Sequence, residues 1–200
     1  MTGIQALEPI AVNLPMRPGK PVAKEFEYKR NGTQTLIAAI NVATGKVSAH
    51  CGQTRTEEDF CHFIKALVED NPGHQVYHIV CDQLNTHKSE SLVRFVDKYC
   101  HLGADLGIKG KTGLLKSMQT REDFLCDTSH SIIFHYTPKH GSWMNQIEIW
   151  FGILTKKLIK RGNFSSTENF KKKLLDFIEY FNRTMAKPFR WTYEGKILTA

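Results

Sequence analysis

The chain has 200 residues and a mass of 22.9 kDa, the size of one domain or of one domain with a small appendage. Its 41% apolar content and mean hydropathy of −0.35 suit a soluble globular protein and exclude collagen-like and disordered classes. No apolar run approaches the roughly 18 residues that a membrane helix needs, so we expect no membrane partner. Five cysteines without a CxxC pair, and no signal-peptide pattern, predict a protein of the reducing cytoplasm.

The formal net charge is +7, and residues 139–200 carry all of it. Residues 1–138 are neutral because their acidic and basic residues balance. A charge confined to one end of the chain favours a surface that faces a polyanion, with nucleic acid the leading candidate. A solvated, lysine-rich helix face explains the same charge without any partner.

The first third of the chain predicts an extended segment, a hairpin and a helix. Residues 1–32 are rich in Pro and charge, which indicates an extended or loop segment with a short strand near 25–28. The β-prone runs on either side of the turn ATGK predict a hairpin over 34–51. Thr56, followed by three acids, is typical of a helix N-terminus, and Asn71-Pro72-Gly73 ends that helix.

The middle of the chain predicts strands that alternate with helices. The apolar run 76–81 predicts a buried strand, and Ser89 caps a helix that follows it. Residues 103–130 are irregular, with a short helix near 114–124, and residues 131–136 predict another strand.

Two helices are predicted near the C-terminus. Ser142 caps a helix that runs from Trp143 to about Arg161, and Ser165 and Glu168 have the spacing of a capping box for the next helix. The order of hairpin, helix, strand, helix, strand and helix predicts an α/β fold with a mixed sheet.

Two acids are the candidates for chemistry. Asp82 directly follows the strand VYHIVC, at the rim of the sheet where α/β proteins place their sites, although an Asp that begins a turn fits the same position. Glu148 falls beside the apolar stripe of its predicted helix, where burial is costly unless a metal ion or a lysine meets it. Carboxylates that hold Mg²⁺ beside a phosphate-binding surface are the parts of a two-metal phosphoryl-transfer site.

Basic residues gather around the two C-terminal helices. The candidates for contact with DNA phosphates are Lys156, Lys157, Lys160, Arg161, Lys171, Lys172 and Lys173. Lys139 and His140, in the loop before Glu148, are further candidates for DNA contact. His87, in the loop after Asp82, fits either a phosphate contact or an ordinary polar loop residue.

Three long motifs resemble the DDE transposases of bacterial insertion sequences, in the branch related to mariner elements. They are CDQLNTHKS, FHYTPKHGSWMNQIEIWFGILTKKLIKRGNF and FIEYFNRTMAKPFRWTYEGK. The resemblance covers nearly the whole chain, with the motifs in the family's order.

This resemblance implies a ribonuclease H-like fold, a mixed sheet flanked by helices, in which three acids hold two divalent ions, Mg²⁺ or Mn²⁺. It makes Asp82 the second acid and Glu148 the third, with Asn145 as a neighbour on the acid-bearing helix. It also implies double-stranded DNA as the partner, both transposon ends and target, and a homodimer for the full-length protein.

The family's first acid ends a strand just before the stretch TGIQAL, which here begins at Met1, so no residue matches it. We therefore expect residues 1–200 to be the C-terminal part of a catalytic domain that lacks the first central strand and is inactive alone. Residues 103–130 are expected to be a subgroup insertion, and residues 162–200 a basic helical extension. Two alternatives stay open: a catalytically dead DNA-binding remnant, and a metal-dependent nuclease that cuts without joining.

Overall fold

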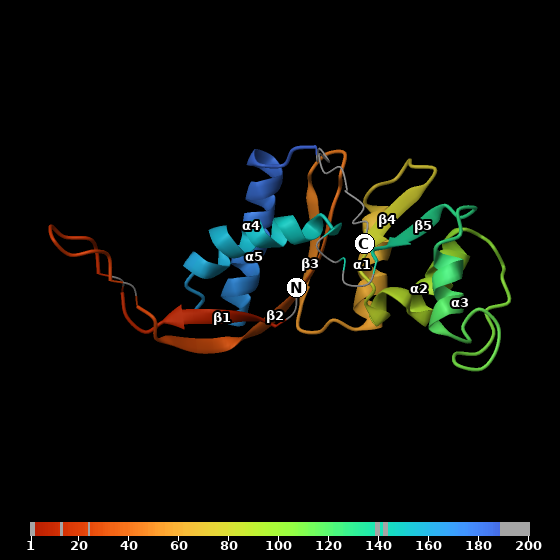
Figure 1. Ribbon diagram of the computed structural model, residues 1–200, viewed down its shortest axis with the longest axis horizontal. Coiled ribbons are helices and arrows are strands. Elements are labelled where there is room, and N and C mark those ends of the chain that lie inside the picture. Colours follow the sequence, from red (N-terminus) through yellow and green to blue (C-terminus); the bar gives the residue numbers. More distant parts are fainter. Residues whose placement is uncertain (1–2, 13, 24, 139–140, 142–143, 189–200) are drawn as a thin grey trace, which may run out of the picture.

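The computed structural model describes residues 3–12, 14–23, 25–138, 141 and 144–188 (Figure 1). This part of the chain forms two small β-sheets flanked by five α-helices, which confirms the predicted α/β fold. None of the helices in these ranges has the length and apolar content to cross a membrane.

The first sheet is antiparallel, with the strand order β1-β2-β3. β1 (Ile4–Pro9) pairs with the first half of β2 (Tyr28–Ile40), and β3 (Val47–Gly52) pairs with the second half. The hairpin expected over 34–51 is confirmed, but β2 starts well before it and replaces the separate short strand expected near 25–28. The polar start of β2 is extended because it pairs with β1, a non-local partner that a local pattern does not reveal.

A two-stranded arm connects β1 to β2 and projects away from the rest of the molecule (Figure 1). The amide of Ile10 donates to the carbonyl of Glu27 at 3.2 Å, the amide of Leu14 donates to that of Ala23 at 2.9 Å, and the chain reverses beyond Arg17. Many apolar side chains of the arm are exposed, and none of its described residues belongs to a buried cluster.

The second sheet consists of β4 (Tyr77–Cys81) and β5 (Ile132–Tyr136), which run parallel. Both strands were expected from their apolar sequences, and their register places Cys81 opposite Tyr136. Within the described ranges no strand joins this sheet to the first one. The described strands thus form two separate sheets.

Three helices pack against the second sheet: α1 (Glu57–Glu69), α2 (Glu90–Tyr99) and α3 (Met118–Leu125). The N-terminus of α1 is the predicted one, because Thr56 and Asp59 form a reciprocal capping box. Buried side chains of all three helices pack against β4 and β5 in one apolar core.

The last two long helices, α4 (Ile147–Lys157) and α5 (Thr167–Thr184), pack together against the first sheet, and the ring of Trp150 on α4 lies 6.1 Å from that of Phe181 on α5, measured between centroids. The single helix expected from Trp143 to Arg161 is shorter, because the backbone tightens into a 3₁₀ turn at Ile159–Arg161. Its predicted cap Ser142, like Trp143, lies outside the described residues.

The cap of α5 is Ser166, not Ser165 as expected. Ser166 has an extended backbone, and its hydroxyl accepts a hydrogen bond from the amide of Asn169 at 3.1 Å. The expected box with Glu168 was therefore wrong by one residue, since either of two adjacent serines satisfies the sequence rule.

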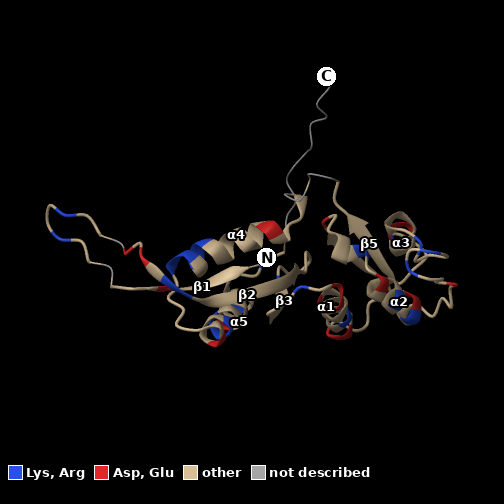
Figure 2. Ribbon diagram, turned by 90° about the horizontal axis from the view of Figure 1, so that it is seen from below, with Lys and Arg blue, Asp and Glu red and all other residues tan. Residues whose placement is uncertain are grey.

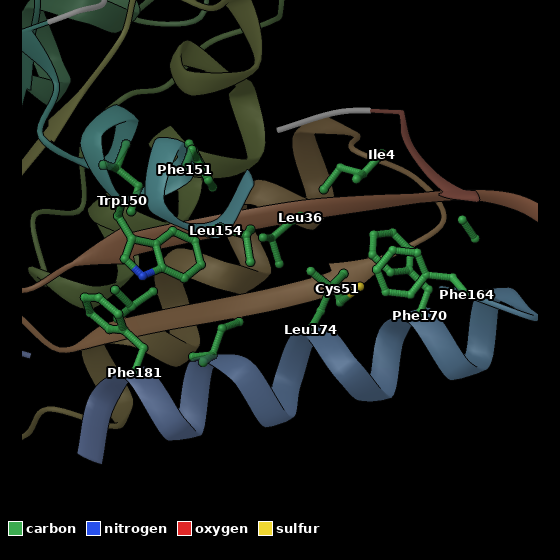
Figure 3. Close-up of a cluster of buried hydrophobic side chains, with 14 residues drawn as sticks. Ile4, Leu36, Cys51, Trp150, Phe151, Leu154, Phe164, Phe170, Leu174 and Phe181 are labelled. Atoms are coloured by element: carbon green, nitrogen blue, oxygen red, sulfur yellow. The ribbon is translucent and has the colours of Figure 1, made fainter. Parts of the chain in front are cut away.

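A second core fills the space between the first sheet, α4 and α5 (Figure 3). Trp150 and Leu154 reach it from α4, and Phe170 and Leu174 from α5. Leu36 on β2 belongs to this core, whereas the next residue, Ile37, belongs to the other. Because successive strand residues face opposite sides, β2 is shared by both cores.

Candidate active site

A cavity of about 570 Å³ lies between the second half of β2 and β4. Its walls are residues 36–40 of β2 and 78–81 of β4, with apolar side chains of α1 as a further wall. Asp82 and Glu148 both line this cavity. The structure thus places the two sequence-predicted acids on one cavity, as the candidate metal site requires.

Asp82 follows β4 directly, and its side chain is 40% exposed. The amide of Leu84 donates to its carboxylate at 3.2 Å, so Asp82 also begins the turn that was the alternative reading. The Nδ1 atom of His87 lies 2.8 Å from the same carboxylate oxygen. The hydrogen bond from His87 lowers the pKa of Asp82 most. The electrostatic attraction of His87 and the hydrogen bond from the Leu84 amide lower it further, so the Asp82 carboxylate stays ionised at neutral pH.

His87 has a second contact besides that with Asp82, because its ring packs against Phe60. The ring lies 4.1 Å from that of Phe60 on α1, measured between centroids. The sequence left His87 open between a phosphate contact and an ordinary polar loop residue, and neither its contact with Asp82 nor that with Phe60 has a local signature. Its position beside the Asp82 carboxylate makes it part of the candidate site.

Glu148 lies in the first turn of α4 and is exposed. Glu148 therefore avoids the cost of burial, because only its neighbour Ile147 enters the core. The helix buries Ile147, Trp150, Phe151 and Leu154, and Glu148, on the flank of this apolar stripe, lines the cavity. Asn145 lines the same cavity.

Arg55 is a site residue that the sequence analysis did not single out. It lies in the loop between β3 and α1, is exposed and lines the cavity. Its charge is one of the influences that lower the pKa of Asp82. Only its place directly before the Thr56 cap could have drawn attention to it.

The basic residues lie at the far end of α4 from Glu148 (Figure 2). At 1.5 Å per residue, Lys157 is about 13 Å along the helix from Glu148. Seven basic residues of this region were predicted to contact DNA phosphates. Six of them are exposed: Lys156, Lys157, Lys160, Arg161, Lys171 and Lys172. Lys173 differs, because its ammonium donates to the carbonyl of Asn163 at 2.7 Å and lies over the ring of Phe164. The predicted contacts Lys139 and His140 fall outside the described residues.

Comparison with known proteins gives one family. The model of the DDE superfamily endonucleases matches residues 4–171, a range that contains both acids and both sheets. No curated protein and no solved structure is detectably similar to the chain. The extent of the family match shows that this chain belongs to the DDE superfamily endonucleases.

Proposed function

We propose that the chain is the C-terminal part of the catalytic domain of a DNA transposase, which cleaves phosphodiesters at transposon ends and joins them to target DNA. The observation that carries this proposal is the convergence of Asp82 and Glu148 on one cavity within a DDE endonuclease domain. The proposal includes the mariner-related branch and a homodimer for the complete protein.

The donor chemistry of the two acids fits Mg²⁺ or Mn²⁺, since these ions take carboxylate oxygens. Asp82, kept ionised by His87, and Glu148, exposed on α4, would hold such an ion. When bound, two ions activate a water or a DNA 3′-hydroxyl and stabilise the leaving oxygen. In the described part of the chain, no group of three His, Cys, Asp or Glu residues is placed to hold an ion. The pair is therefore an incomplete ligand set.

The register of the first sheet indicates where a third acid would enter. Ile4 lies opposite Gln34, so a strand that continued β1 upstream would run along residues 38–40 of β2. These residues line the cavity, with β4 on the other wall. The family's first acid, which ends that strand, would then lie beside Asp82. This supports the inference that residues 1–200 are one part of a longer catalytic domain.

Arg55 and the exposed basic residues of α4 and α5 would bind and orient the DNA. Arg55 presents a guanidinium on the cavity wall, a group that suits phosphate oxygens. The exposed lysines of α4 and α5 would contact the backbone of the duplex farther from the acids. Neither contribution needs a base-specific contact.

Metal-dependent nicking of duplex DNA tests the proposal. The chain should be inactive as it stands and active when extended upstream by a strand that ends in Asp, and joining of a pre-cut end should follow. Cleavage without joining would favour the nuclease. The incomplete ligand set favours the DNA-binding remnant as a second candidate, and DNA binding without cleavage by the extended chain would support it.

A further inference from the structure

We propose that Lys88 and Glu122 position the turn that carries Asp82, and that the segment 103–130 serves the site through Glu122. The inference rests on the proposed role of Asp82 as a metal ligand. Lys88 and Glu122 are positioning residues here, because neither lines the cavity.

Lys88 is an unusually buried cation, with a side chain only 8% exposed. Its ammonium lies 2.6 Å from a carboxylate oxygen of Glu122, donates to the side-chain carbonyl of Gln83 and lies 4.6 Å from the ring centroid of Tyr136. A buried ammonium group needs such partners, because losing water is costly for a charge. Lys88 is thereby fixed to three different elements.

Two of these partners, Gln83 and Tyr136, are hydrogen-bonded in a way that holds the Asp82 turn. The side-chain amide of Gln83, the residue after Asp82, donates through Nε2 to the backbone carbonyl of Thr137 at 3.0 Å. The hydroxyl of Tyr136 donates to the carbonyl of His87 at 2.7 Å. The end of β5 therefore holds the turn at both ends, and Lys88 connects the turn to α3.

Glu122 gives residues 103–130 a role in this arrangement. It lies on α3, inside that segment, and its carboxylate is engaged by Lys88. It is thus a counter-ion rather than a further metal ligand. A buried ion pair contributes little net stability compared with apolar residues of similar volume. What it provides at this place is a fixed orientation of Gln83, which follows Asp82 in the chain, and of the segment that carries His87, which contacts the Asp82 carboxylate.

Two variants separate positioning from folding, and both are made in the chain extended upstream by an acid-bearing strand, because the unextended chain is expected to aggregate. Lys88→Met leaves the Glu122 carboxylate without its cation, so the thermal midpoint should fall. Lys88→Met combined with Glu122→Gln removes both charges and should regain most of the midpoint. Arg94→Met is the matched control, since it removes an exposed Arg94–Glu90 pair on α2.

The decisive readouts are amide exchange at Leu84 and His87, measured by NMR, and Mn²⁺ affinity, followed by paramagnetic broadening of the same amides. We expect about tenfold or faster exchange in both Lys88 variants, as for the loss of one charged hydrogen bond. Mn²⁺ should bind about 10–100-fold more weakly, the usual effect of losing a residue that orients a ligand. The Arg94 control should match the wild type in both measurements.

A double variant with a recovered midpoint and wild-type exchange and Mn²⁺ affinity would overturn the inference. A double variant that does not fold would overturn it too, since the pair would then be a requirement of the fold. If the wild-type chain binds too little Mn²⁺ to titrate, exchange at the two amides decides alone. Asp82→Asn separates the two proposals, because Mn²⁺ binding that survives it refutes the proposed metal site, whatever the Lys88 variants show.

Discussion

The predicted basic surface on α5 is tested by the salt dependence of DNA binding. Each lysine–phosphate contact adds about 0.9 to the slope of log K against log salt concentration on duplex DNA. Lys171 and Lys172 are exposed, whereas Lys173 is engaged with Asn163 and Phe164. Replacing Lys171 and Lys172 with Gln should therefore reduce the slope by about 1.8 and weaken binding to all sequences alike.

The measurement is fluorescence anisotropy of a labelled duplex between 50 and 200 mM salt, the range in which such contacts have large effects. Lys173→Gln should leave the slope unchanged, because that ammonium already has protein partners. Lys65, an exposed residue of α1 that is paired with Glu69, provides Lys65→Gln as a control for the general loss of positive charge. An unchanged slope in the double variant would make Lys171 and Lys172 solvated surface, and an effect of Lys173 equal to theirs would refute the structural distinction.

Three further predictions concern the acids and the core. In a chain extended by an acid-bearing strand, Asp82→Asn or Glu148→Gln should abolish cleavage in a nicking assay and leave duplex binding within about twofold. The lowered pKa of Asp82 means that its contribution to stability is present above about pH 4, the usual pKa of an unfolded Asp, and is lost as the pH falls through the folded value. Asp82→Asn should therefore flatten the acid limb of a chemical unfolding series. Leu174→Ala should lower the free energy of unfolding by about 2–5 kcal/mol, measured by urea titration, because Leu174 is fully buried.

Local rules predicted those elements whose cause is local. The cap of α1 depends on Thr56 and Asp59, three residues apart, and the sequence placed it correctly. The strands ending at Cys81 and Tyr136 were recognisable as short apolar runs. Where two neighbouring residues have the same chemistry, as Ser165 and Ser166 do, a local rule finds the cap only to within one position.

The site itself was predicted only in part, because most of its contacts join distant segments. Asp82 and Glu148 were identified by their places at a strand end and on a helix flank. Arg55 reaches the cavity from another loop, and the ion pair of buried Lys88 with half-buried Glu122 spans 34 residues. No periodicity marks such contacts, so charge and spacing alone could not find them.

A strand that continued β1 upstream into the cavity would have two separable effects. It would cover the apolar walls formed by residues 36–40 and 78–81, and it would bring a carboxylate to Asp82. Open strand edges favour association, so we expect the chain to aggregate when expressed alone. Extensions that end in Asn or in Asp differ only in the carboxylate, so both should raise the soluble fraction, and only the Asp version should nick DNA with Mg²⁺. Light scattering and a nicking assay on the same preparations measure the two effects. Cleavage by the Asn version, or by the unextended chain, would show that another residue supplies the third ligand.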